Sequence, residues 1–253
     1  MFVFAHLSDV HLDLGPRALE RTRRVMDYLR GLPIDAILVT GDIADHGDAA
    51  EYEQARDELS IPAVPVLILP GNHDDRSAFT KVLRDREATG PVNLACRIGE
   101  VLFLLCDSSI PHHNEGLLEP ETLAWIRARL DETEGPAFIC LHHPPVALAI
   151  PLVDGIRLGS PGGLAAIVAE HPRVVAVLCG HAHTAAATTF VGRPLLVAPG
   201  VVSTARLPWT TADELTWTNA ADLDDTPAVA FHVLDDNRRL ITHFRNAPAA
   251  TRE

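Results

Sequence analysis

Lysine is almost missing from this chain of 253 residues, and acidic residues outnumber basic ones. Only Lys81 is a lysine, so 20 of the 21 basic residues are arginines, against 34 acidic residues and a formal net charge of −13. So acidic a chain argues against a protein that binds long nucleic acid by neutralising many phosphates. A small substrate with one phosphate is still allowed if something other than side chains supplies positive charge locally.

Cysteine is also scarce. The 4 cysteines stand singly within apolar runs and form no Cys-x-x-Cys pair: Cys96, Cys106, Cys140 and Cys179. This spacing argues against a disulfide framework and against a structural zinc site. We expect small buried side chains at these positions and a reducing cytoplasm as the compartment of the protein.

Long hydrophobic runs are lacking. No apolar run reaches the roughly 18 uncharged residues of a membrane span. Residues 1–12 lack the basic residues with which a signal peptide begins, and they contain the charged residue Asp9. We therefore expect neither a signal peptide nor a membrane span. The apolar share of 47% predicts a folded protein, and no linker or repeat divides the chain. We therefore predict a single domain over residues 1–253.

Short apolar runs alternate with longer amphipathic segments up to about residue 185. We predict strands at 2–8, 35–40, 65–70, 102–106, 137–141 and 174–179. We predict helices at 16–30, 48–59, 118–132 and 162–171. The strands are apolar throughout, which is typical of sheets that helices cover.

The last part of the chain has a different pattern, without helical periodicity. We predict one hairpin around Gly192–Arg193 and a second, C-terminal hairpin that turns at 235–237. Between them lies the polar segment 207–226, which contains Trp209 and Trp217. We expect this segment to form a long loop or flap.

Five of the predicted strands are each followed by polar residues of similar chemistry. These are Asp9-Val10-His11, Gly41-Asp42, Gly71-Asn72-His73-Asp74, His142-His143 and Gly180-His181-Ala182-His183. Loops at the carboxyl ends of strands converge in α/β proteins, and ligands bind there. One such block alone is ordinary turn chemistry, but five at successive strand ends favour a common site.

The residue types in these blocks indicate metal binding. Carboxylate, amide and imidazole groups without a thiolate suit manganese, iron, zinc or cobalt. The candidate ligands are Asp9, His11, Asp42, Asn72, His142, His181 and His183. They are too many for one catalytic metal, which takes about three protein ligands, but they suit two metals that share a carboxylate. Two divalent cations would also attract a phosphate despite the acidic chain.

The five blocks together resemble the signature of calcineurin-like metallophosphoesterases. Residues 116–130, the His142–Pro145 block and the end of the chain are similar to the class III cyclic nucleotide phosphodiesterases and their glycerophosphodiesterase relatives. The resemblance implies an α/β fold: a four-layer αββα sandwich of two mixed β-sheets flanked by helices, with the C-terminal β-hairpin.

The resemblance also implies a role for each block residue. One metal would be held by Asp9, His11 and His183, and the other by Asn72, His142 and His181. Asp42 would bridge the two metals. His73 would face the phosphate together with Asn72 and would not bind metal.

The implied activity is that of a metal-dependent phosphoric diester hydrolase, with 3′,5′-cyclic AMP or 2′,3′-cyclic nucleotides as expected substrates. A hydroxide between two metals about 4 Å apart would attack phosphorus, and His73 would assist the leaving group. We expect manganese or iron, with zinc and cobalt as alternatives. A phosphomonoesterase or nucleotide pyrophosphohydrolase would share the same ligands. A non-catalytic scaffold of the same fold is a further alternative, and a homodimer through 207–226 is also open.

Other residues near the blocks have less definite expectations. Asp45 and His46 can orient ligands, and Asp74 is expected to support its turn. Four residues can either line the site or lie on the surface: His112, His113, Asp154 and Arg157. Trp209 and Trp217 can either cover the site or serve in packing. We expect His143 to point away from the site, and His6, His171, His232 and His243 to be structural.

Overall fold

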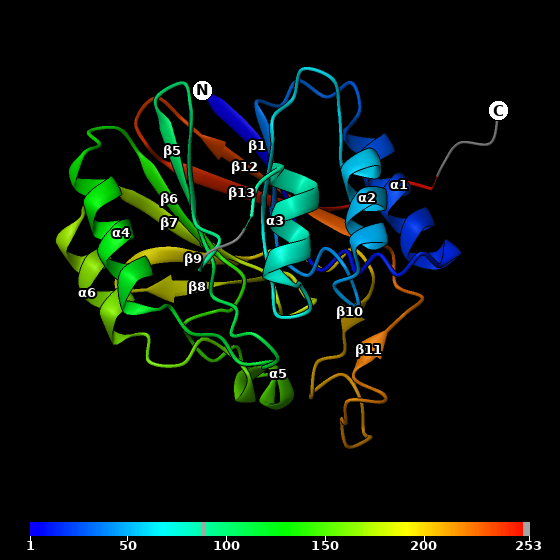
Figure 1. Ribbon diagram of the computed structural model, residues 1–253. Helices are drawn as coiled ribbons and strands as arrows, with labels where there is room; N and C mark the ends of the chain where they lie inside the picture. The colour runs from blue at the N-terminus through cyan, green and yellow to red at the C-terminus, as the bar shows by residue number, and fades with distance from the viewer. Residues whose placement is uncertain (88–89, 250–253) are drawn as a thin grey trace.

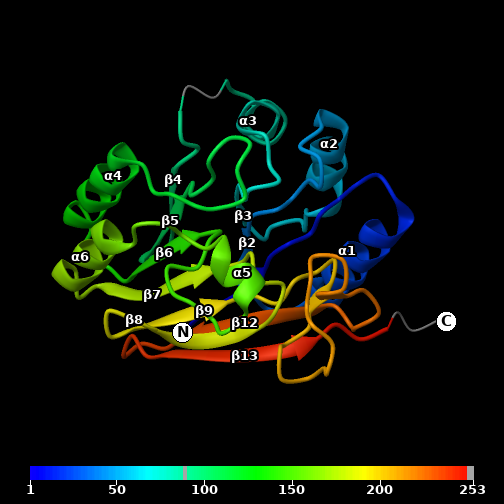
Figure 2. The same ribbon diagram turned by 90° about the horizontal axis from the view of Figure 1, so that it is seen from below.

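Two β-sheets pack face to face in the computed structural model, which describes residues 1–87 and 90–249 (Figure 1). The first sheet has the strand order β13-β12-β1-β2-β3 and the second the order β4-β5-β6-β7-β9-β8. Both sheets contain parallel and antiparallel neighbours. Helices cover the outer face of each sheet, as the view from below in Figure 2 shows. The predicted four-layer αββα sandwich is therefore confirmed.

The first sheet lies under three helices. Its strands are β1 (Phe2–Leu7), β2 (Ala36–Thr40), β3 (Val66–Leu69), β12 (Ala228–Leu234) and β13 (Leu240–Asn246), and β12 and β13 form the predicted C-terminal hairpin. The helices are α1 (Pro16–Leu29), α2 (Ala49–Glu58) and α3 (Arg76–Arg84). Alternation along β1 sorts the side chains, because Ala5 and Leu7 pack under the helices while Phe4 packs against the second sheet.

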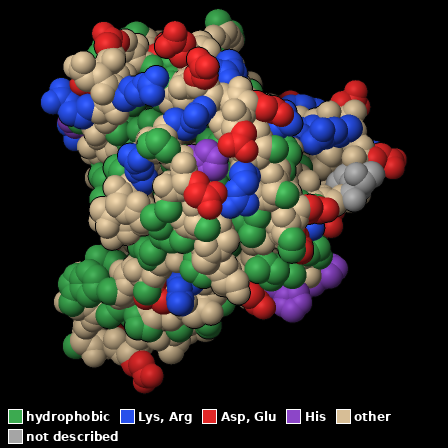
Figure 3. Space-filling view, turned by 90° about the vertical axis from the view of Figure 1, so that its left-hand side faces the viewer, with side chains coloured by type: hydrophobic (Ala, Val, Ile, Leu, Met, Phe, Trp, Pro, Cys, Tyr) green, Lys and Arg blue, Asp and Glu red, His purple; other side chains and the backbone are tan. Residues whose placement is uncertain are grey.

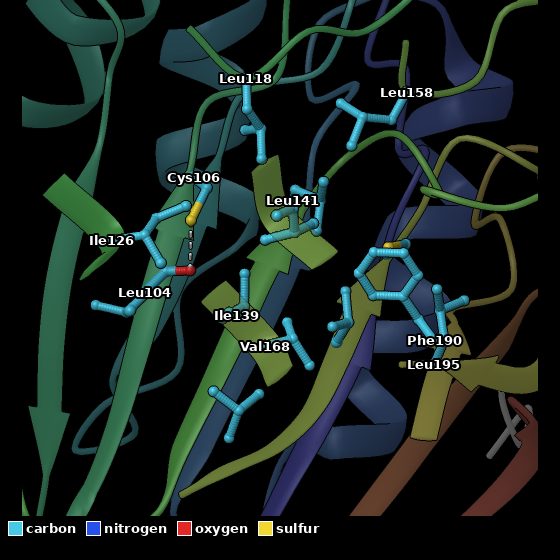
Figure 4. Close-up of a cluster of buried hydrophobic side chains, with 14 of the residues drawn as sticks. Leu104, Cys106, Leu118, Ile126, Ile139, Leu141, Leu158, Val168, Phe190 and Leu195 are labelled. Carbon is cyan, nitrogen blue, oxygen red and sulfur yellow. Dashed lines mark hydrogen bonds between the residues drawn. The ribbon is translucent and has the colours of Figure 1, made fainter. Parts of the chain in front are cut away.

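The second sheet lies under α4 (Pro120–Asp131) and α6 (Gly162–Glu170), and the short helix α5 (Pro151–Gly155) lies at its end. Its strands are β4 (Leu94–Ile98), β5 (Val101–Cys106), β6 (Ala137–Leu141), β7 (Val174–Cys179), β8 (Ala186–Phe190) and β9 (Arg193–Val197). Figure 4 shows Leu104 and Ile139 of the sheet against Ile126 and Val168 of the helices. Burial of both faces explains why the central strands are apolar throughout.

Besides the two-residue strands β10 (Thr204–Ala205) and β11 (Ala221–Asp222), three elements lie outside the sequence-based prediction. The strand β4 is an edge strand whose residues alternate between half-buried and exposed, so it lacks the continuous apolar run of the other strands. The helices α3 and α5 are short. The helix α3 closely follows a polar block, and α5 follows a proline-rich segment. An amphipathic pattern over so few residues is hard to distinguish from a loop.

The hairpin between β8 and β9 turns one residue earlier than predicted. Phe190 pairs with Arg193, so Val191 and Gly192 form the turn, and both have positive φ. The predicted loop 207–226 is mostly irregular, but a small ribbon of β10 (Thr204–Ala205) and β11 (Ala221–Asp222) closes its base.

Charged side chains of both signs are mixed on the surface. On the side that carries α4 and α6, basic side chains are interspersed with acidic and hydrophobic ones (Figure 3).

The cysteines agree with the expectation of small unpaired side chains. Three of the four cysteines are buried and all four are unpaired. Within residues 1–87 and 90–249 there is no helix with the length and hydropathy of a membrane span.

Two buried histidines join neighbouring strands of the first sheet within the core. His6 Nδ1 lies 3.1 Å from His232 Nε2, and His6 Nε2 lies 2.9 Å from the Thr40 hydroxyl. His232 Nδ1 lies 2.8 Å from the Thr242 hydroxyl. Burial lowers the pKa of His6 well below its usual range and that of His232 to about 3. Both imidazoles are therefore neutral structural groups, as expected.

Stability should decrease in acid because of this pair. Below the usual histidine pKa of about 6.5, the unfolded chain binds protons that the folded core excludes. The free energy of unfolding should therefore fall as the pH drops from about 6.5 toward the pKa of about 3 of His232. In His232→Gln this slope should be smaller by up to about 1.4 kcal/mol per pH unit, the value for one proton.

Urea unfolding followed by circular dichroism at several pH values measures these slopes. The matched control is His243→Gln, because His243 is exposed on the same hairpin. Parallel stability curves for the wild type and His232→Gln would contradict the prediction.

Candidate metal centre

Candidate ligands from five loops meet at one end of the sandwich. Asp9 and His11 follow β1, Asp42 follows β2, Asn72 and His73 follow β3, His142 follows β6, and His181 and His183 follow β7. The cavity that six of these eight side chains line also includes residues of α5, β10 and β11, which lie together in the view from below (Figure 2). Both sheets therefore contribute to one site, as the strand-end argument predicts.

The backbone is strained at most of these positions. Five of the residues adopt positive φ angles although they are not glycine: Asp9 (54°), His11 (45°), Asp42 (51°), His181 (70°) and His183 (50°). Such angles cost free energy in residues with a Cβ, and they cluster at functional sites. Here they turn short polar side chains back over the strand ends. The backbone amides of Val10 and His11 both donate to the Asp42 carbonyl at 2.9 Å, which holds two of the loops in this shape.

Two glycines allow the loops to approach closely. A Cβ on Gly71 would overlap the Asp42 carboxylate, and one on Gly41 would lie 2.5 Å from His142 Nδ1. Gly41 also has a φ of +96°. The glycines of these blocks are therefore required by the close packing around Asp42 and His142.

The first half of the cluster contains Asp9, His11, Asp42 and His183. His11 Nε2 lies 3.4 Å from Asp42 Oδ2 and 3.2 Å from His183 Nε2. His183 Nε2 lies 3.6 Å from Asp9 Oδ1. Four candidate ligand atoms from three separate loops thus surround one position.

The second half contains His142, His181 and Asn72 and shares Asp42 with the first. His142 Nε2 lies 3.3 Å from Asp42 Oδ2, the same oxygen that faces His11. His181 Nδ1 lies 3.2 Å from His142 Nε2. The Asn72 side chain lines the same cavity, and its Oδ1 atom is buried. One carboxylate therefore stands between two groups of ligand atoms.

The imidazoles are oriented by partners on their far side. His142 Nδ1 lies 2.7 Å from the Thr40 carbonyl, His11 Nδ1 lies 2.8 Å from Asp45 Oδ1, and His183 Nδ1 lies 2.8 Å from the Ser203 hydroxyl. A carbonyl or a carboxylate accepts, so Nδ1 of His142 and of His11 carries the hydrogen. Their Nε2 lone pairs then face Asp42. This second set of contacts is the usual arrangement around histidines that bind metal.

The residues fit a pair of cations chemically. When both rings are neutral, the lone pairs of His11 and His142 point at a carboxylate oxygen, so electron-pair donors face one another unless a cation or a proton lies between them. Three further atoms are buried without a hydrogen-bond partner in the described ranges: Asp9 Oδ2, Asn72 Oδ1 and His181 Nε2. Such burial is costly unless another group satisfies these atoms. A divalent cation in each half would satisfy both conditions.

The local electrostatics also call for positive charge. Burial opposes ionisation of Asp42, but His142 and His11 hold the pKa of its carboxyl well below the usual range. Burial likewise opposes charging of His142, but the Asp42 carboxylate raises its pKa to about 9. For His181 and His183 burial lowers the pKa. Positive charge is thus most favourable beside Asp42, between the two halves.

The neighbouring acidic residues have distinct structural roles. Asp45 contacts His11 at 2.8 Å, as expected. His46 is exposed, pairs with Glu51 at 2.8 Å and lies 3.5 Å from Asp45 Oδ2, so it can act on a ligand only through Asp45. Asp74 supports its turn, because it accepts from the Gly71 amide at 2.8 Å and from the Tyr52 hydroxyl at 3.0 Å. Burial raises the pKa of Asp74 to about 6.

His143 was expected to point away from the site, and that prediction is wrong. It is buried, and its ring centroid lies 4.6 Å from that of His181. Its Nδ1 lies 2.8 Å from the Ser108 hydroxyl and its Nε2 lies 3.1 Å from the Asn114 carbonyl, so both nitrogens are engaged. The strand β6 ends at Leu141, and the alternation of side chains that the prediction assumed ends with it.

The structure also places the residues for which a site role and a surface role were both open. His112 and His113 are exposed and are not among the cavity residues, to which Asn114 belongs instead. Asp154 accepts from the amides of Leu148 and Ile150 and shapes its own loop. Arg157 donates to the Asp154 carbonyl.

Sequence reasoning missed Thr40 and Ser203 as orienting groups. Thr40 acts through its backbone carbonyl, which leaves no mark in the sequence. Ser203 lies outside the five blocks and reaches His183 only because its loop folds over β7. A search for polar residues near strand ends would have found Ser203 among many others.

The cavity at the cluster has a volume of about 630 Å³. Its polar side includes His11, Asp42, Asn72, His73, His181 and His183. Its remaining wall includes Val153, Ile156, Val202, Ala205 and Trp217. Among the described residues that line it there is no arginine or lysine. The cavity therefore joins a potential metal site to an apolar wall.

Comparison with known proteins gives consistent matches. Residues 2–185 match the family model of the calcineurin-like phosphoesterases. The chain is 32% identical over 215 residues to a glycerophosphodiester phosphodiesterase of Enterobacter lignolyticus, over 79% of this chain and 77% of that protein. It is 32% identical over 216 residues to a cAMP/cGMP dual specificity phosphodiesterase of Mycobacterium tuberculosis, over 78% of this chain and 66% of that protein.

The fold is also similar to solved structures. A dimetal phosphatase from Danio rerio superimposes with a TM-score of 0.71 at 16% identity, over 98% of this chain and 96% of that chain. At this level of identity the similarity concerns the fold alone. It agrees with the two flanked sheets described above.

The contact between Asp45 and His11 predicts an effect on metal affinity. In Asp45→Asn the His11 ring loses its carboxylate partner, so metal affinity should fall roughly tenfold or more. The backbone carbonyl of residue 45 is unchanged, and so is its contact with His73. Titration of the metal-free protein with manganese against a chelator measures the affinity. The control is Asp57→Asn, the same substitution at an exposed carboxylate of α2, which should bind as the wild type does. Equal affinities of all three proteins would contradict the prediction.

Proposed function

The chain belongs to the calcineurin-like phosphoesterase family, hydrolases with a dinuclear divalent metal centre, and we propose that it hydrolyses small phosphodiesters. The observation that carries the proposal is the position of Asp42. One oxygen of this carboxylate faces His11 Nε2 at 3.4 Å and His142 Nε2 at 3.3 Å. Two ligand groups that share a carboxylate are the arrangement that a two-metal phosphoesterase needs.

The proposed metal ligands follow the two halves of the cluster. Asp9, His11 and His183 would hold one cation, and Asn72, His142 and His181 the other, with Asp42 between them. Oxygen and imidazole donors without thiolate favour manganese or iron, with zinc or cobalt as alternatives. When bound, the two cations would supply Lewis-acid charge that activates water and neutralises the phosphoryl oxygens.

His73 is the proposed general acid. Its backbone amide donates to Asp42 Oδ1 at 3.0 Å, and its Nδ1 donates to the Asp45 carbonyl at 2.9 Å. These two bonds tie the ring to the cluster and leave Nε2 for the substrate. In the imidazolium form Nε2 stabilises charge on the phosphoryl group and gives its proton to the leaving alkoxide.

Cyclic nucleotides are the proposed substrates, 3′,5′-cyclic AMP or a 2′,3′-cyclic nucleotide. The support is the cavity, which offers one polar cluster for one phosphodiester and an apolar wall beside it. The relatives named as a cyclic nucleotide phosphodiesterase and as a glycerophosphodiester phosphodiesterase agree with this class of substrate. A long nucleic acid is disfavoured by the net charge of −13.

A panel of phosphoesters tests the proposal directly. The protein is loaded in turn with manganese, iron, cobalt or zinc and assayed on cyclic nucleotides, glycerophosphodiesters, phosphomonoesters and a nucleoside diphosphate. We expect the highest kcat/KM for diesters, because the cavity has no basic side chain for a second phosphate in the part of the chain that is described. A preference for monoesters or pyrophosphates would support the alternative hydrolases. Inactivity on every substrate would favour a non-catalytic scaffold.

Removal of His73 should separate turnover from metal binding. In His73→Ala, kcat for bis(p-nitrophenyl) phosphate should fall roughly 100-fold or more, because the leaving group loses its acid. The metal content should stay at the wild-type value, because the proposal assigns no metal to this imidazole. Steady-state kinetics and elemental analysis measure both quantities.

The matched control is His113→Ala, which removes an exposed imidazole outside the cavity. It should leave both values unchanged. Wild-type turnover in His73→Ala would exclude the proposed role of His73.

A further inference from the structure

Trp217 is a large aromatic side chain that is 62% exposed, yet it lines the cavity of the metal cluster. It belongs to the segment 207–226, which projects beside α5 below the sheets (Figure 1). Ala205, Ala220 and Ala221 line the cavity with it. These neighbours are small, and the indole is the largest apolar side chain among the described residues that line the cavity. A large apolar side chain that faces a polar site suggests a ligand group that covers it.

The position of Trp217 is linked to the metal cluster by backbone bonds. The Ala205 amide donates to the carbonyl of His183 at 2.9 Å, so β10 begins directly beside a proposed ligand. β10 pairs with β11 through Thr204–Asp222 and Ala205–Ala221, and the Arg206 amide donates to the Ala220 carbonyl at 2.7 Å. The base of the segment is therefore fixed relative to His183.

A turn then fixes the backbone around Trp217. The Asn219 side chain accepts from the Thr216 amide at 2.7 Å and donates to the Glu214 carbonyl at 3.1 Å. The Ala220 amide donates to the Thr216 carbonyl at 2.9 Å. Trp217 thus lies inside a closed, hydrogen-bonded turn. Such a turn presents a side chain in a defined place rather than on a free loop.

The charge of the cavity limits what can lie against the indole. Asp13 and Asp45 line the cavity, and no lysine or arginine does so among the residues that the structure places there. A second phosphate or a carboxylate on the substrate would meet these acidic groups without a compensating cation. The part of the substrate beside Trp217 should therefore carry no negative charge, and an uncharged flat ring meets this condition and covers an indole face best.

We propose that Trp217 is the specificity-determining residue that selects phosphodiesters with a flat, uncharged ring, such as a nucleobase, over aliphatic phosphodiesters. The inference rests on the proposed phosphodiesterase function. In this arrangement the metal cluster holds the phosphodiester group. The indole stacks on a ring that belongs to the esterified alcohol, such as the base of a nucleoside. Stacking tolerates any base because every base has a π-face, so Trp217 selects for a ring rather than for one base.

The segment contains its own control. Trp209 is 66% exposed and belongs to the same stretch, but it is not among the residues that line the cavity. Trp217→Ala removes the proposed stacking surface, Trp217→Phe retains a flat ring, and Trp209→Ala removes an equally exposed indole elsewhere. The three variants change the same type of residue within one segment.

Two measurements on the manganese-loaded protein test the inference. The first is kcat/KM for 3′,5′-cyclic AMP and for glycerophosphoglycerol, which has no ring. We expect Trp217→Ala to lower kcat/KM for cyclic AMP by about tenfold, within the range for loss of one stacked base, and to leave glycerophosphoglycerol unchanged. Trp217→Phe should retain most of the preference, and Trp209→Ala should retain all of it.

The second measurement is calorimetric binding of a phosphorothioate analogue of cyclic AMP that resists hydrolysis. We expect the same order of variants, with a loss of affinity of about tenfold for Trp217→Ala alone. If the wild type hydrolyses neither diester but this order of affinities holds, the proposed function fails and the role of Trp217 stands. If Trp217→Ala changes both substrates equally, changes neither, or binds the analogue as the wild type does, the role of Trp217 is refuted.

Discussion

The carboxylate of Asp42 is the group on which the site depends. It is buried where His11 Nε2 and His142 Nε2 converge on one of its oxygens, and the charge of these two rings holds the pKa of its carboxyl well below the usual range. Without positive charge beside it, this assembly of electron-pair donors would be unfavourable inside a protein. The fold therefore places a strong demand for cations at one point between its two sheets. Cations bound at this point would attract a phosphate despite the acidic chain.

The scaffold has to hold this unfavourable assembly in place, and several features serve that end. Strained backbone at five candidate ligands is tolerated because buried strands on both sheets anchor the loops. Contacts behind the rings with Thr40, Asp45 and Ser203 orient His142, His11 and His183. The neutral pair His6 and His232 connects β1, which leads to Asp9 and His11, with its neighbour β12 in the core.

The cavity combines this rigid polar cluster with a wall from another part of the chain. The cluster belongs to the strand ends of the sandwich, whereas the wall comes from α5 and the residue that follows it, from the chain around β10 and from the segment 207–226. Two functions are thus separated in space: the cluster is suited to the phosphodiester and the wall to the group attached to it. Loop segments of this kind can change without disturbing the core, so substrate preference can vary on a constant metal site.

The chain by itself determined the central strands, the helices α1, α2, α4 and α6, and the five polar blocks, because burial and strand-end chemistry leave local patterns. These patterns also predicted that the blocks would converge. The edge strand β4, the orienting carbonyl of Thr40, the contact of His143 with His181 and the approach of Trp217 were decided only by the tertiary structure. Each depends on which segments meet across the two sheets, and contacts between residues far apart in the chain have no local signature.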